Sequence, residues 1–221
     1  MLKRVRWIDA AKGITILTVI IGHTIGKNAL GNFLRGIIFS FHMPLFFILS
    51  EVTSRCPQTN TEFISKTKKS FSHLIIPAVF VFFVLTVSEC VKDYYLIGDK
   101  NYWIGKIYTF VFASGVKTTF GDIEIRMIGI PWFLFCLFFG RTIFDYLHMC
   151  FDDIQLHIIS WAICMIGIVF GKIQWLPFSI DIALAIMPLF YYGNKMDLIR
   201  ISHSPFKKMF LWGGYGYLVF Y

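Results

Sequence analysis

Charged residues are scarce in this chain, and their scarcity excludes an ordinary soluble domain. Asp, Glu, Lys and Arg make up 15% of the 221 residues, and hydrophobic residues make up 57%. Soluble domains have about 25% charged and about 45–50% apolar residues. The mean hydropathy is +0.66, and several apolar runs are long enough to cross a hydrocarbon core of about 30 Å. The sequence therefore predicts an all-α fold, a polytopic bundle of transmembrane helices.

The sequence also lacks the cysteine spacings of metal sites. Its cysteines include no C-x-x-C pair and stand at positions 56, 90, 136, 150 and 164. Three of these positions fall in expected membrane spans, where a free cysteine behaves as a small apolar residue. Neither a zinc site nor a disulfide framework is indicated, and we expect no bound metal.

Acidic residues are fewer than basic ones, which gives a formal net charge of +8. The basic residues form short clusters between apolar runs, at 3–6, 66–69 and 207–208. This distribution favours a positive-inside topology over a polyanion-binding surface. We therefore expect contact with membrane lipid, a cytoplasmic N-terminus and no nucleic-acid partner. No A-x-A-like cleavage site follows the first apolar run, so this run is expected to be a retained span.

About six spans are expected from the length and hydropathy of the apolar runs, together with the start of a seventh. The expected spans are 8–26, 36–52, 74–91, 129–147, 157–171 and 180–193. The run 209–221 is too short to cross a bilayer, so the chain is expected to end inside its seventh span.

The segments between these spans are expected to be loops. Residues 27–35 would form a short outer loop, and 53–73 and 194–208 would be polar cytoplasmic loops. The outer segment 92–128 contains an apolar stretch, 102–115, that is short and carries a lysine. This stretch is typical of an amphipathic or re-entrant piece at the membrane interface.

Ionisable residues occur at two depths of the first expected span. Lys12 and His23 are eleven positions apart, which returns them to within about 20° of one helix face. Their separation along the axis is about 16 Å, so their side chains share a face but do not touch. Asp9 lies one helical turn before Lys12, where a local ion pair is available.

This helix face is also distinguished by the residues around it. Small or polar residues share the face of Lys12 and His23, namely Asp9, Thr15, Gly22 and Gly26. Large aliphatic residues fall on the opposite face, namely Ile14, Leu17, Ile21 and Ile25. One stripe is therefore suited to helix packing and the other to lipid.

His42 is expected to lie in the second span at a depth similar to that of His23. The two spans are joined by a short loop and should be antiparallel neighbours. His23 is about three residues from the outer end of the first span, and His42 is about six residues from the outer end of the second. Burying an ionisable residue in a membrane is costly, so two histidines at matched depth indicate function. Hydrogen bonding across helices remains the alternative for each histidine, and snorkelling to the interface is the alternative for Lys12.

Ser50, Trp132 and Arg126 are weaker candidates for contact with substrate. Ser50 falls near the inner end of the second span, but no histidine stands at a spacing that is typical of an activated serine nucleophile. Trp132 also fits an aromatic belt, and Arg126 fits a solvated loop.

The order of four sequence blocks resembles the membrane acyltransferase type 3 family, and within it the sugar O-acetylase branch. The blocks are WIDAAKGITIL…GH (7–23), SFHMPLFFILS (40–50), IPWFL (130–134) and LPFSIDIALAIMPLFYYG (176–193). The family signature is a basic residue followed, after ten intervening positions, by a histidine. Here these residues are Lys12 and His23, and many members have arginine in place of the lysine. Many members carry Ser-Gly where this chain has Ser50-Glu51. The family usually has about ten spans, so we expect a truncated member.

The resemblance implies a single integral membrane domain over 1–221, located in a bacterial plasma membrane. Acyl-CoA, with acetyl-CoA as the first candidate, would be the donor from the cytoplasmic side. A hydroxyl of a carbohydrate or glycolipid would be the acceptor from the outer side. A transporter or exporter module of the same architecture, and a non-catalytic truncated remnant, are the alternatives.

Roles for four residues follow from this interpretation. His23 is the expected general base, because an imidazole titrates near the operating pH. His42 would orient His23 or hold the acceptor. Lys12 would contact the phosphate or pantetheine of the donor, and Asp9 would position Lys12.

Overall fold

The computed structural model describes residues 6–25, 28–120 and 123–196, without the side chains of Arg6, Trp7, Asp9, His23 and Ala29. The chain divides into two compact units, which are described separately. The N-terminal unit is Met1–Arg55 with Leu189–Tyr221, and the central unit is Cys56–Pro188. Apart from one two-stranded sheet, the regular elements among the described residues are helices, so the prediction of an all-α fold is confirmed. The prediction of one domain over 1–221 stays a prediction.

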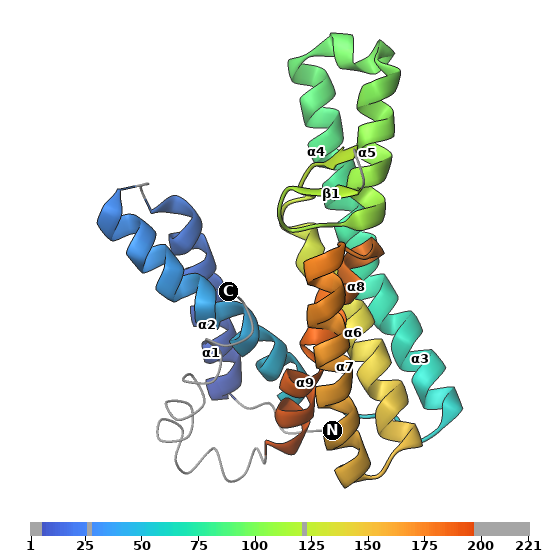
Figure 1. Ribbon diagram of the computed structural model, residues 1–221. Coiled ribbons are helices and arrows are strands. Elements are labelled where there is room, and N and C mark those ends of the chain that lie inside the picture. Colours follow the sequence, from blue (N-terminus) through green and yellow to red (C-terminus); the bar gives the residue numbers. More distant parts are fainter. Residues whose placement is uncertain (1–5, 26–27, 121–122, 197–221) are drawn as a thin grey trace. The chain divides into compact units, whose positions relative to one another are not determined.

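The N-terminal unit begins with a helical hairpin of α1 (Arg6–Thr24) and α2 (Ala29–Val52) (Figure 1). The expected loop at 27–35 was wrong in extent, because α2 already begins at Ala29. Asn28 is the N-cap, and its side chain accepts a hydrogen bond of 2.7 Å from the Gly31 N–H. Residues that had indicated a loop therefore start a helix instead.

The two stripes expected on α1 are present. Thr15 and Gly22 are buried, whereas Ile14 and Leu17 are 62% and 59% exposed. A Cβ on Gly22 would lie 2.7 Å from Cε1 of Phe39 in α2, so this close approach of the two helices requires glycine. The small face of α1 packs on α2, and the aliphatic face is left for lipid.

Helix α9 (Met187–Lys195) packs against the C-terminal half of α2 within the N-terminal unit. The rings of Phe47 and Phe190 have centroids 6.1 Å apart. A Cβ on Gly193 would lie 2.8 Å from the carbonyl oxygen of Ile48 and 3.0 Å from Cβ of Glu51. Only a residue without a side chain allows the two backbones to approach this closely.

One long helix dominates the central unit. It consists of α3 (Asn60–Ser70), the π-helical turn η1 (Phe71–Ile75) and α4 (Ile76–Lys92). The expected loop at 53–73 was therefore wrong for most of its length. Thr59 caps the helix by accepting a hydrogen bond from the Glu62 N–H, and the π turn precedes Pro77, whose missing N–H interrupts the α-helical ladder.

Helix α5 (Lys100–Phe112) follows the 3₁₀ turn η2 (Tyr94–Gly98) and packs antiparallel on α4 (Figure 1). It ends at Ala113, which has a left-handed φ of 46°. The strands β1 (Thr118–Phe120) and β2 (Ile123–Ile125) then form an antiparallel pair.

Helices α6 (Pro131–Cys150) and α7 (Asp153–Ile173) confirm that the runs at 129–147 and 157–171 are helical. Asp152 and Gln155 form a capping box at the start of α7. The expected span at 180–193 was wrong as a single helix. After the 3₁₀ turn η3 (Pro177–Ser179), α8 (Ile180–Ala185) stops before α9, because Pro188 cannot donate the next hydrogen bond.

Four helices in the described residues are long and apolar enough to cross a membrane: Leu30–Val52, Asn60–Lys92, Pro131–Cys150 and Asp153–Ile173. The apolar part of α1, Ala10–Gly22, is shorter. A polytopic helical membrane protein is therefore confirmed, but six spans are not. The expected seventh span at 209–221 lies outside the described residues.

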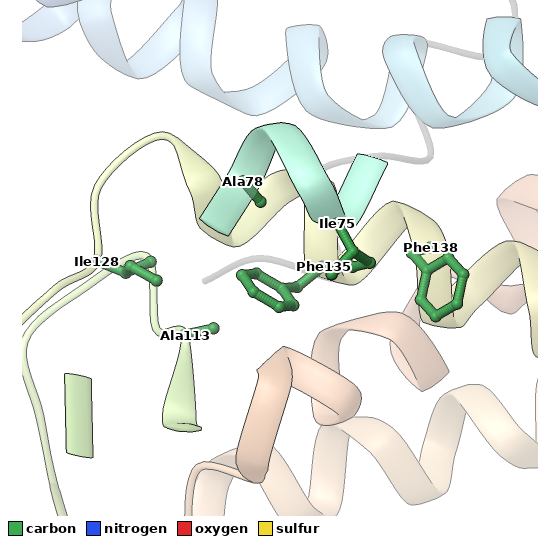
Figure 2. Close-up of a cluster of buried hydrophobic side chains, with 6 residues drawn as sticks. All are labelled: Ile75, Ala78, Ala113, Ile128, Phe135 and Phe138. Atoms are coloured by element: carbon green, nitrogen blue, oxygen red, sulfur yellow. The ribbon is translucent and has the colours of Figure 1, made fainter. Parts of the chain in front are cut away.

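The main apolar cluster of the central unit joins α4, the end of α5 and the start of α6 (Figure 2). It consists of Ile75, Ala78, Ala113, Ile128, Phe135 and Phe138. The ring of Phe178, in η3, stacks on Phe135 with centroids 5.7 Å apart. The polar segment between α5 and α6 is thereby anchored at the level of Ala78.

Candidate functional site

Lys12 lies where α1 passes the C-terminal end of α2. Its Nζ donates a hydrogen bond of 2.9 Å to Oγ1 of Thr53, the C-cap residue of α2. A cation at this position is favoured by the partial negative charge of the helix terminus. The lysine is therefore held across the hairpin.

His42 is buried within α2, with 6% of its surface exposed. Its Nδ1 lies 2.7 Å from the carbonyl oxygen of Ile38. Because a carbonyl can only accept, Nδ1 carries the proton in this arrangement, and Nε2 is the basic nitrogen of the neutral ring. The ring also packs on Phe39, with centroids 5.4 Å apart.

The contacts between α1 and α2 set the relative depth of the two histidines. Gly22 lies against Ile38, since a Cβ added to Gly22 would be 3.1 Å from Cγ2 of Ile38. In an antiparallel pair His23 then falls opposite residue 37, and His42 is five residues or about 7.5 Å farther along α2. The expectation that the two histidines lie at similar depth used wrong ends for the two helices, and the offset of about 7.5 Å replaces it. The side chains of His23 and Asp9 lie outside the described residues, so a contact between the imidazoles and the Asp9–Lys12 ion pair stay predictions.

The hairpin places a basic residue and two histidines along one pair of packed helices. Comparison with known proteins gives a family model, described as an acyltransferase domain, that matches residues 5–221. The chain belongs to the acyltransferase type 3 family. No curated protein and no solved structure matched the chain. The four long apolar helices agree with a membrane acyltransferase.

Ser50 and Glu51 stand where the resemblance to the acyltransferase type 3 family implies Ser-Gly. Ser50 is buried, and its Oγ donates to the carbonyl oxygen of Phe47 at 2.8 Å, so its hydroxyl bonds within its own helix. Glu51 is also buried. Gly193 lies directly against Glu51, and a glycine in α9 thus provides the space that the larger residue in α2 requires.

Trp132 and Arg126 lie in the central unit of this acyltransferase. Three atoms of the Trp132 ring would lie 2.9 Å from a Cβ on Gly115, and the ring packs against the main apolar cluster. Arg126 is exposed between β2 and α6. The tryptophan is therefore half-buried against that cluster, and the arginine is exposed.

The sequence analysis missed two buried charged groups in the central unit. Asp145 lies 2.7 Å from Nζ of Lys66, which ties α6 to α3. Asp181 is 2% exposed, and its Oδ1 has no hydrogen-bond partner among the described residues. It follows Phe178 and Ser179, which have left-handed φ values of 57° and 53°. An aspartate inside the apolar block 176–193 was the signal, but it also fitted a helix cap.

Proposed function

We propose that this chain is an O-acyltransferase that moves an acyl group, with acetyl as the first candidate, from acyl-CoA to a hydroxyl of a cell-surface carbohydrate. Membership in the acyltransferase type 3 family supports the reaction class. The observation that carries the proposal is the α1–α2 hairpin, which holds Lys12 at one end and buries His42 farther along.

His23 acts as the general base in this proposal. It accepts the proton of the acceptor hydroxyl while that oxygen attacks the thioester carbonyl. The carbon–sulfur bond then breaks, and the coenzyme A thiolate takes the proton from the imidazolium. The acyl group ends as an ester on the carbohydrate.

His42 acts on the acceptor or on His23. The carbonyl of Ile38 fixes its tautomer, so that Nε2 is the nitrogen that can accept a hydrogen bond. The Cα–Cβ bonds of an α-helix tilt toward its own N-terminus, and α1 and α2 run in opposite directions. This tilt reduces the offset of about 7.5 Å between the two backbones, and a shared hydroxyl or a direct contact can bridge the remainder.

Lys12 binds the phosphate or pantetheine of the donor, with Asp9 positioning it. An ammonium has three N–H donors, so its bond to Thr53 is compatible with a ligand contact. Ser50, Trp132 and Arg126 are proposed to contact substrate. Arg126 is the accessible one of the three and suits an anionic carbohydrate.

The test is the ester itself, measured as O-acetyl groups on surface glycan of cells that express the gene. We expect the ester with the unchanged chain and its loss with His23→Ala. His73→Ala is the matched control, because His73 is exposed in the central unit. Ester at the unchanged level in His23→Ala would overturn the role of His23. Movement of glycan across the membrane without ester formation would favour the transporter module.

A further inference from the structure

The α4–α5 hairpin extends past the ends of the other helices of the central unit (Figure 1). Helix α6 runs antiparallel along α3 and the start of α4, since Tyr146 pairs with Phe63 and Phe138 with Phe71. Helix α5 instead packs beyond Ala78. From Ala78 to Lys92 the helix rises about 21 Å. The tip of the hairpin is therefore about 21 Å from the apolar cluster around Ala78, where α6 begins.

The exposed surface of this hairpin is mostly apolar. The exposed residues include Phe80, Phe83, Val84, Leu85, Val87 and Val91 on α4, with Trp103, Ile104 and Ile107 on α5. Side chains of this kind contact lipid tails at low cost but are unfavourable in water over so large an area.

The two charged residues within the hairpin neutralise each other. Between 78–91 and 101–112 these are Glu89 and Lys106, whose side chains lie 2.8 Å apart. The hydroxyl of Tyr102 also donates to Glu89, at 3.1 Å. The ammonium lies 5.4 Å from the centroid of the same tyrosine ring. Pairing of this kind is how charges are tolerated at membrane depth.

The tip of the hairpin has the composition of a membrane–water interface. Tyr94 and Tyr95 are 65% and 73% exposed, and Trp103 is 42% exposed. Lys92 and Asp93 precede the two tyrosines, and Asp99 and Lys100 follow them. Aromatic and basic residues gather where a helix leaves the hydrocarbon layer, so the occupant of the apolar surface is lipid, with the interface at the tip.

This placement puts a polar, non-helical segment below the membrane surface. The segment from Ser114 to Phe120, with Ile123 to Arg126, is anchored by Ile128 at the level of Ala78. Its Lys117 and Glu124 side chains are 72% and 67% exposed. Irregular backbone and exposed charge at this depth are tolerated where they line a water-filled cavity.

We propose that α4 and α5 form a hairpin embedded in the leaflet opposite the basic helix α3, with its tip at the surface of that leaflet. The segment 114–120 with 123–126 thereby lines a water-filled vestibule that opens to that side of the membrane. The proposal rests on the central unit alone and is independent of acyl transfer, so its failure leaves the proposed function untouched.

Single cysteines on a background with the five native cysteines replaced by alanine test the proposal. Ile107→Cys reports on the lipid face, Thr119→Cys on the vestibule and Asp99→Cys on the tip. In intact cells a membrane-impermeant maleimide should label the tip and vestibule positions at least tenfold faster than Ile107→Cys. If Ile107→Cys were labelled as fast as Asp99→Cys, the hairpin would lie in water and the proposal would be wrong. If Thr119→Cys were not labelled at all, the segment would not line a water-filled vestibule.

Photolabelling of the unmodified chain in phosphatidylcholine vesicles avoids any effect of the cysteine replacements on folding. A lipid-soluble carbene probe should modify Phe83, Val87 and Ile107 but not Lys117 or Glu124. Modification of the first three by a water-soluble carbene probe instead would overturn the proposal.

Discussion

The α1–α2 hairpin and the α4–α5 hairpin both place ionisable residues on apolar helices, but they hold the charge differently. In α4–α5 the ammonium of Lys106 lies against the carboxylate of Glu89. In α1–α2 the ammonium of Lys12 donates to the hydroxyl of Thr53. His42 is buried eleven residues before Thr53, or about 16 Å along the helix axis. The ion pair in α4–α5 joins two helices, whereas the polar groups of α1–α2 are the ones that we propose to bind the substrates.

After His23→Ala, the substitution with the largest expected effect on acyl transfer is His42→Ala. We expect the rate of acyl transfer to fall by about 10²-fold or more, because an orienting imidazole is lost, while the folded yield is retained. His157→Ala, on α7, is the matched control. Unchanged transfer by His42→Ala in an assay with purified protein would make His42 a packing residue only.

Gly22→Ala tests whether close packing of α1 on α2 supports the site. The new Cβ would lie 2.7 Å from Phe39, and overpacking costs about 1–3 kcal/mol. Because Phe39 packs on His42, transfer should also fall. Gly13→Ala is the control on the same helix, since no atom lies within 4 Å of its Cβ. Equal melting temperatures of the two variants would contradict this packing.

Lys106→Met tests the other hairpin. Removing the cation leaves Glu89 without its ion pair, which we expect to lower the free energy of unfolding by about 1–2 kcal/mol, because a hydrogen bond between charged groups is lost. Acyl transfer per folded molecule should stay the same. Lys117→Met breaks a longer and more exposed pair, at 3.6 Å, and should leave thermal stability unchanged. A loss of transfer in Lys106→Met without a loss of stability would contradict the conclusion that Lys106 serves only to join α4 and α5.

Lys12→Arg has the smallest expected effect, because the positive charge is kept and many relatives are expected to carry arginine there. We expect transfer to stay within about threefold, which corresponds to less than about 0.7 kcal/mol. Lys12→Met should instead raise the KM for acyl-CoA. Similar KM values for the two variants would argue that Lys12 only caps α2.

The sequence predicted helical segments close to the helices of both hairpins, but it did not predict helix α3, which leads into α4. The stripes of α1 were predicted, because small and aliphatic residues repeat with the helical period and one face packs on α2. Helix α3 was not predicted, because it has few apolar residues, none of them buried, and its lysines were typical of a loop. Its helical structure comes from the cap at Thr59 and from contacts with α6, including Lys66–Asp145.

Parts of the candidate site depended on contacts that a sequence does not show. Lys12 was predicted as a cation of the hairpin, but its bond to Thr53 requires the register of two helices. The tautomer of His42 follows from a carbonyl one turn away. Asp181 was passed over because the burial of its carboxylate arises from the packing of α8.

The central claim is that the α1–α2 hairpin transfers an acyl group. Purified protein in vesicles, given radiolabelled acetyl-CoA and a carbohydrate acceptor, tests it most directly. The account predicts label in an ester on the acceptor with the unchanged chain and with His73→Ala, and none above background with His23→Ala. Equal labelling by His23→Ala would contradict it.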